Sequence, residues 1–203
     1  MVAGLDQLRG ELDRMPSAKR RAPRLLVAAL ALPPVQVVDS IFTPEVELAR
    51  FRASLPGTAP TALSGGASSR VELIRRFVTA VETNDTLALN RLLLSKAEFA
   101  YFYFPASEYS RPPYRQKPGL VWFRMTESSQ KGIGRVLARD GGKPLAATGH
   151  RCPTLGKPAG LIRLWNECRL FGRQDGRTLE RHLFGSIIER NGAYKFLTYA
   201  SDY

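Results

Sequence analysis

The sequence predicts an α+β protein in which helices are followed by a curved antiparallel sheet. Helical spacing of apolar residues dominates up to about residue 139, and it is clearest in the stripe formed by Val71, Ile74, Phe77, Val78 and Val81. After residue 142 the apolar residues alternate instead, and Asn191-Gly192 is a strong signal for a two-residue hairpin. Helices that precede a meander of strands pack on one face of the sheet.

Residues 1–31 have the layout of a secretory signal. Basic residues at positions 19–21 precede an apolar run at residues 25–32, and Ala29-Leu30-Ala31 offers small residues to a signal peptidase. We therefore expect an exported protein, either periplasmic or of the cell envelope. The run is too short for a transmembrane span, which needs about 20 residues. A basic leader, either of the mitochondrial type or merely disordered, is the alternative, and translation could start at Met1 or Met15.

Residues 32–67 are expected to form a flexible lead-in with one short helix. Pro44 suits a helix start, and acidic residues in the first turn suit the helix dipole. Residues 56–69 are rich in glycine and proline, as linkers are. We therefore place the globular domain at residues 68–203 and expect the chain before about residue 65 to be loosely attached.

The domain is expected to open with helices that have recognisable starts. Ser68 or Ser69 caps the first helix, and residues 87–94 follow as a second. Ser95 and Glu98 have capping-box spacing, which favours a helix through the aromatic run at residues 99–104, although the aromatic residues themselves favour a strand. A proline-rich loop at residues 105–118 precedes a third helical region at residues 119–139, with a break expected near the glycines at 132 and 134.

Strands are expected at residues 145–152, 161–171, 178–190 and 193–200. In the second of these, one side suits a buried face and consists of Ile162, Leu164, Asn166, Cys168 and Leu170. Cys152 and Cys168 would lie on adjacent strands of an exported protein, so we expect them to form a disulfide. Two free buried thiols are the alternative.

This layout resembles the NTF2-like, or SnoaL-like, superfamily. The resemblance covers residues 69–203 and rests on the amphipathic helix 71–82, the following Asn84-Asp85-Thr86, and the terminal strands from Ile187 to Phe196. It implies a cone-shaped α+β fold with an apolar interior, in which enzymes of the SnoaL branch use a carboxylate as general base. The insertion at residues 105–118 departs from the usual pattern.

Charge and motifs exclude several classes of function. The net charge is +12, and 24 basic against 15 acidic residues remain after residue 31, spread along the chain, so nucleic acid is not an expected partner. No nucleophile elbow, P-loop or Cys-x-x-Cys motif occurs, and with His150 and His182 as the only histidines no metal site and no cofactor are expected.

Two functions remain, and both place a site between the sheet and the helices. The first is non-catalytic binding of a small apolar ligand or a protein partner, with a homodimer left open. Its expected wall residues are Tyr101, Tyr103, Trp165 and His182, with the proline-rich loop as a lid. The alternative is a SnoaL-like isomerase, cyclase or hydrolase, in which a pocket carboxylate would be drawn from Glu98, Glu167, Glu180 and Asp202.

Overall fold

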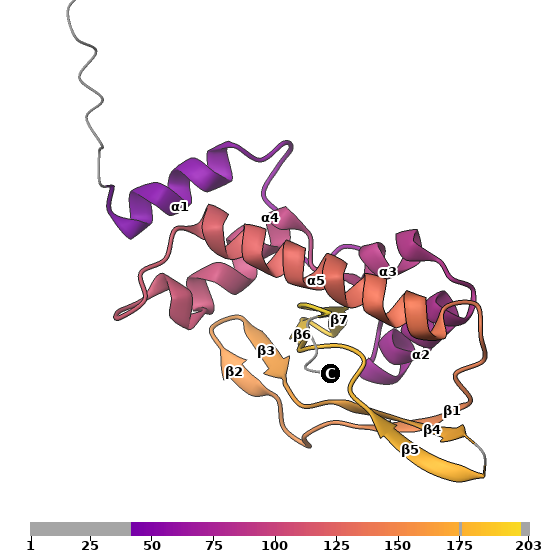
Figure 1. Cartoon of the computed structure of the whole chain (residues 1–203). Coiled ribbons are helices and arrows are strands. Elements are labelled where there is room, and N and C mark those ends of the chain that lie inside the picture. Colours follow the sequence, from indigo (N-terminus) through magenta and orange to yellow (C-terminus); the bar gives the residue numbers. More distant parts are fainter. Residues whose placement is uncertain (1–41, 175, 200–203) are drawn as a thin grey trace, which may run out of the picture. The chain divides into compact units, whose positions relative to one another are not determined.

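The structure is a computed structural model that describes residues 42–174 and 176–199 (Figure 1). The signal-like segment, the lead-in up to residue 41, and Asp202 lie outside the described residues. The described residues belong to one compact unit, which contains helices and antiparallel strands, so the α+β class is confirmed.

The helices begin where their capping residues stand. The side chains of Ser69, Asp85 and Ser95 each accept a hydrogen bond from a backbone N–H in the first turn of the following helix, and Ser95 and Glu98 form the expected capping box. The helical segments are α1 (Pro44–Ala53), α2 (Arg70–Glu82), α3 (Thr86–Leu92), α4 (Lys96–Glu98), the π-helical turn η1 (Phe99–Tyr103), the 3₁₀ turns η2 (Phe104–Ala106) and η3 (Glu108–Ser110), and α5 (Pro118–Asp140).

Two details of the helices differ from expectation. Val71 is 64% exposed, and Leu73 takes part in the buried face of α2 instead of it. Ile74, Phe77 and Val81 are buried as expected. Helix α5 continues through both glycines, and Gly132 has a packing role there. A Cβ atom at Gly132 would lie 2.0 Å from the carbonyl oxygen of Tyr199, so only glycine lets the C-terminal segment approach the helix this closely.

The described strands form two antiparallel sheets instead of one. The three-stranded sheet has the order β1 (Ala147–Arg151), β4 (Arg169–Gln174), β5 (Arg177–Arg181). The four-stranded sheet has the order β2 (Lys157–Ala159), β3 (Ile162–Trp165), β6 (Ile187–Arg190), β7 (Ala193–Phe196). Figure 1 shows β6 and β7 beneath the helices, with the longer strands β4 and β5 extending away from them.

The expected strands 161–171 and 178–190 are each interrupted and pass from one sheet to the other. The first breaks at residues 166–168, where Glu167 adopts a left-handed backbone conformation with φ of +58°. This break shifts the alternation, so Trp165 is buried and Asn166 is exposed, the reverse of the expected pattern.

Two apolar clusters fill the interior. In the first, Phe77, Phe184, Phe196 and Tyr199 pack with ring centroids 4.8–5.7 Å apart, between α2 and the strands. The second surrounds Phe99 in the π-helical turn and includes residues of α1 and α5. The interior beneath the helices is therefore occupied by aromatic side chains of the chain itself.

The structure also differs from the domain boundary expected at residue 68. Phe51 of α1 packs edge-to-face on Phe99 at a centroid distance of 6.0 Å, and the Arg52 guanidinium donates two hydrogen bonds of 3.1 Å to the Ala100 carbonyl. Leu63 is buried in the second cluster, and Ala67 forms a β-bridge with Tyr194. Residues 42–67 therefore pack on the domain, through the contacts of Phe51, Arg52 and Leu63.

Candidate functional site

The four residues expected at the pocket wall lie in different parts of the fold. Tyr101 and Tyr103 pack on the second cluster, whereas Trp165 belongs to the first. The Arg52 guanidinium lies over the Tyr101 ring, 4.5 Å from the ring centroid. Tyr101 also borders a recess of about 200 Å³ beside the β2–β3 turn. His182 is half-buried between β5 and β6.

Tyr103 is suited to donating a hydrogen bond and poorly suited to acting as a base. Burial raises the pKa of Tyr103 to about 12, with a smaller contribution from the negative charges that Tyr109 and Glu108 carry when ionised.

The expected lid, residues 105–118, folds back on itself. The Gln116 N–H donates to the Tyr109 carbonyl at 2.7 Å, and the rings of Tyr109 and Tyr114 meet edge to face.

The disulfide between Cys152 and Cys168 is present, as expected. Their Cα atoms lie 4.2 Å apart, directly after β1 and directly before β4. The bridge closes the end of the three-stranded sheet at the point where the chain passes to the other sheet. Trp165, three residues earlier, has a buried indole N–H without a hydrogen-bond partner in the described residues.

The three candidate carboxylates that lie within the described residues are committed to structural contacts. Glu98 is buried, and its two oxygens accept hydrogen bonds from the backbone N–H groups of Ser64 and Ser95 and from Lys195 Nζ. Glu167 pairs with Arg169, and Glu180 pairs with Arg151 on the surface of the three-stranded sheet. Glu98 therefore has a structural role, because both of its carboxylate oxygens already accept hydrogen bonds from the chain itself.

A groove of about 570 Å³ lies between α2 and α3, and we call it the α2–α3 groove. Small and apolar side chains contributed by both helices form part of its lining, namely Ala80, Ala88 and Leu92. Arginines border it, and the loop at Ser64 and Gly65 lines it as well. The groove is thus an amphipathic surface, with apolar groups beside guanidinium groups.

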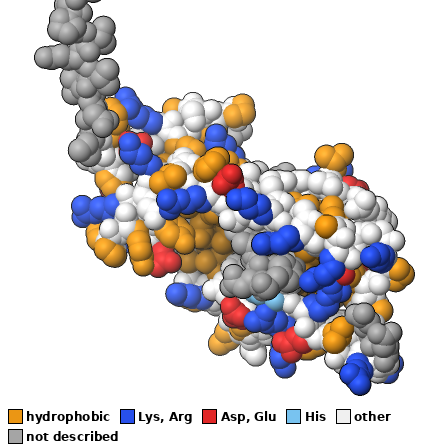
Figure 2. Space-filling view, viewed as in Figure 1, with side chains coloured by type: hydrophobic (Ala, Val, Ile, Leu, Met, Phe, Trp, Pro, Cys, Tyr) orange, Lys and Arg blue, Asp and Glu red, His pale blue; other side chains and the backbone are white. Residues whose placement is uncertain are grey.

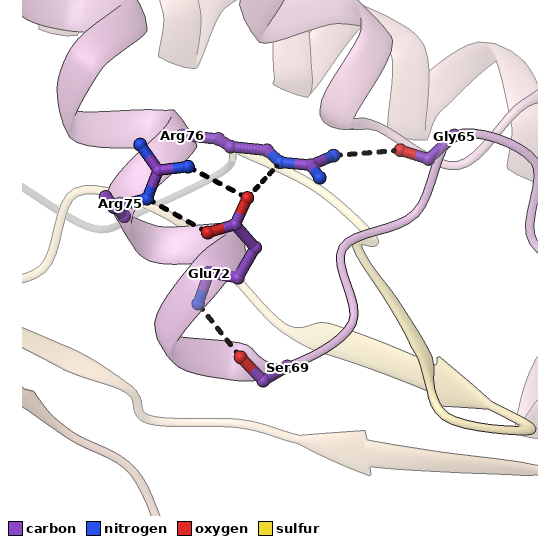
Figure 3. A network of polar contacts seen from close by, with 5 residues as sticks. All are labelled: Gly65, Ser69, Glu72, Arg75 and Arg76. Atoms are coloured by element: carbon purple, nitrogen blue, oxygen red, sulfur yellow. Dashed lines mark hydrogen bonds and ion pairs between the residues drawn. The ribbon is translucent and has the colours of Figure 1, made fainter.

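One carboxylate arranges two of these arginines (Figure 3). Glu72 accepts hydrogen bonds of 2.9 Å from Arg75 and 2.7 Å from Arg76, and Arg76 reaches the Gly65 carbonyl at 3.5 Å. The hydrogen bonds from Arg75 and then Arg76 lower the pKa of Glu72 to about 2, so this carboxylate stays ionised. Arg91, across the groove on α3, has no carboxylate partner among the described residues.

Sequence reasoning missed this groove. The spacing of Glu72, Arg75 and Arg76 at i, i+3 and i+4 is visible in the sequence, but it equally describes a solvated helix face. Only the position of the loop at residues 64–65 against α2 turns that face into the side of a groove.

Positive charge and exposed apolar surface occur together elsewhere on the molecule. Figure 2 shows lysine and arginine side chains spread over the face that carries α5, and a hollow floored by hydrophobic side chains.

Within the described ranges, no group of three or more His, Cys, Asp or Glu side chains is arranged to hold a metal ion. No helix in that part of the chain combines the length and hydrophobicity needed to cross a bilayer.

No family model, curated protein or solved structure matches this chain.

Proposed function

We propose that this domain is a non-catalytic binding module, and that the α2–α3 groove takes a small amphipathic anion with an apolar body and a carboxylate-type head. The observation that carries the proposal is the pairing, in one groove, of apolar side chains with arginines held in place. Ligand sites in proteins combine mostly apolar linings with a few oriented polar groups in this way.

The position of Arg91 determines where the head group would bind. Arg75 and Arg76 already share the Glu72 carboxylate, whereas Arg91 has a guanidinium without a carboxylate partner in the described residues. A guanidinium binds a carboxylate through paired, charge-assisted hydrogen bonds. The apolar body would then lie over Ala80 and Ala88, whose short side chains leave room for it.

Binding is favoured over catalysis by the state of the acidic groups. Asp85 lines the groove, but its side chain caps α3 by accepting a hydrogen bond of 2.8 Å from the Ala88 N–H. The buried carboxylate, Glu98, is paired with Lys195. A SnoaL-like enzyme would need an uncommitted carboxylate that faces a pocket, so we do not favour that alternative.

Export and an NTF2-like relationship also remain proposals. The disulfide supports an oxidising compartment such as the periplasm, and the signal-like residues 1–31 point the same way. Helices followed by antiparallel strands that bend between two sheets are compatible with a cone, although the interior between them is packed with aromatic rings.

The experiment is a titration of the protein with decanoate, in which NMR chemical shifts and calorimetry measure binding. We expect saturable shifts at Ala80, Ala88 and Leu92, and Ala88→Phe should abolish them by filling the groove. Arg91→Gln should weaken decanoate binding about tenfold or more, the effect of losing one charge-assisted hydrogen bond, and should leave decanol binding unchanged. Arg163→Gln, an exposed arginine on β3, is the matched control. Equal binding by wild type and Ala88→Phe would refute the proposal.

A further inference from the structure

A second cavity, of about 570 Å³, is formed by the C-terminal end of α5, residues 143–145 and the β4–β5 hairpin. It shares no lining residue with the α2–α3 groove. We propose that this cavity is a site for a small ligand that carries a di- or polyphosphate group. The inference is independent of the function proposed above.

The first support is the charge of the lining. Among the described residues of the lining, four side chains are basic and one is a carboxylate; these residues are Arg139, Lys143, Arg173, Arg181 and Asp140. The lining therefore carries a net charge of +3. The end of α5 contributes the equivalent of about −0.5, which is too small to offset this excess. Recognition of a multiply charged anion is the chemistry that such a lining favours.

The second support is that two of the guanidinium groups are fixed in place. Asp140 Oδ2 accepts a hydrogen bond of 2.9 Å from Arg139 Nε and a second one from Arg181 Nη2. Burial works against ionisation of Asp140, but the hydrogen bonds from Arg181 and Arg139 outweigh it and hold its pKa below the usual range. Asp140 therefore stays charged and orients both arginines, while it cancels only one of the positive charges.

The third support is that two cations remain uncommitted to a carboxylate. Lys143 Nζ donates to the Arg139 carbonyl at 3.2 Å, and in the described part of the chain neither Lys143 nor Arg173 forms an ion pair. Lys143 follows α5, and Arg173 lies on β4, so the two come from different elements that border the cavity. An incoming phosphate group would supply the acceptors for both.

Glycine lets strand β4 lie directly against the loop at residues 145–146, beside this cavity. A Cβ atom at Gly172 would lie 2.9 Å from the Leu145 carbonyl oxygen, and the neighbouring Arg173 N–H donates to the Ala146 carbonyl at 3.1 Å. The strand therefore lies directly against residues 145–146 without a side chain between them. Leu145 and Leu179 add apolar groups to the lining.

The volume of the cavity favours a larger anion over a single phosphate ion. A cavity of about 570 Å³ is within the range of small-molecule sites and exceeds what one phosphate ion fills. A di- or triphosphate group can contact Lys143 and Arg173 together. The group could come from a free phosphorylated metabolite or from a lipid headgroup, and the experiment separates these sources.

The test is a calorimetric titration of the full chain with sodium tripolyphosphate at low and moderate salt. We expect one saturable site whose affinity decreases with salt concentration. Lys143→Gln and Arg173→Gln should each weaken binding roughly tenfold, as expected for one charge-assisted contact. Matched controls are Lys157→Gln on β2 and Arg163→Gln on β3, which change the net charge equally on the other sheet and should bind as wild type does.

Two further arms identify the source of the phosphate. Vesicles containing diacylglycerol diphosphate, a lipid with a diphosphate headgroup, should compete with tripolyphosphate, through Lys143 and Arg173, if the ligand is a headgroup. Vesicles of phosphatidylcholine alone should not compete. If the diphosphate lipid does not compete, the ligand is a free phosphorylated metabolite; the site itself stands or falls with tripolyphosphate binding through Lys143 and Arg173.

Three results would overturn the proposal. One is the absence of tripolyphosphate binding at millimolar concentration. Another is equal weakening by the two control variants, which would indicate diffuse surface attraction. The third is tighter binding of a short DNA duplex that depends equally on all four positions, since that would assign the positive charge to a nucleic-acid surface. Lys143 and Arg173 are exposed, so both variants are expected to fold, and thermal unfolding checks this.

Discussion

Lys195 Nζ lies 2.9 Å from Glu98 Oε2, in an ion pair whose side chains are 5% and 1% exposed. Lys195 also donates to the Ser64 carbonyl at 3.0 Å, so the pair joins β7, the short helix α4 and the segment before α2. Three parts of the chain distant in sequence are thereby fixed at one buried point. Removing one partner would leave the other charge buried without compensation.

The first prediction follows from that pair. Lys195→Met should lower the free energy of unfolding by about 3–5 kcal/mol, because Glu98 would lose its counter-charge in the interior. Glu98→Gln should do the same by leaving Lys195 unpaired. Urea denaturation measures both values. The double variant should be less destabilised than the sum of the two, and additive losses would show that the two groups do not interact.

The second prediction compares two glycines on one helix. Gly132→Ala should destabilise the protein by about 1–3 kcal/mol or more, because the new methyl group overlaps the backbone of Tyr199. Gly134→Ala, for which nothing lies within 4 Å of the new Cβ, should stabilise it by about 0.4–1 kcal/mol. Thermal unfolding distinguishes them. Destabilisation of both would mean that α5 itself does not tolerate alanine, and the contact with Tyr199 would then not be the cause.

The third prediction concerns the disulfide. Replacing Cys152 and Cys168 together with alanine should cost about 3 kcal/mol, the chain-entropy value for a loop of this length. Mass spectrometry of protein from an oxidising compartment should find both thiols bonded. Equal unfolding midpoints for the oxidised and reduced protein would contradict the expected contribution.

The fourth prediction is a pH dependence at His150. Burial, and then the charge of Arg70, lower the pKa of His150 below 6.5, so the folded state binds its proton less readily than the unfolded state does. Stability should therefore be highest above pH 6.5 and decrease as the pH falls through that value toward the folded-state pKa. NMR titration of the imidazole gives the pKa directly. His150→Gln should lack this component, whereas His182→Gln should retain it.

Local signals in the sequence determined the class of the fold and most helix starts. Ser69, Asp85 and Ser95 cap helices because their side-chain oxygens satisfy backbone N–H groups only a few residues away, and such contacts depend on little else. The disulfide was also predictable, since the expected strands brought Cys152 and Cys168 to neighbouring positions. The caps depend on short-range geometry, and the disulfide depends on the pairing of two strands that periodicity could place.

Tertiary structure alone decided which faces are buried and where the cavities lie. Periodicity could not show that the chain breaks at Glu167, so it placed Trp165 and Asn166 on the wrong sides of their strand. The Glu98–Lys195 pair joins residues 97 positions apart, and neither residue has a local sequence signal that points to the other. The cavity around Asp140 likewise exists because the end of α5 and the β4–β5 hairpin, distant in sequence, meet there. Burial depends on contacts between residues far apart in the sequence, whereas helix caps and hairpin turns form from hydrogen bonds between residues only a few positions apart.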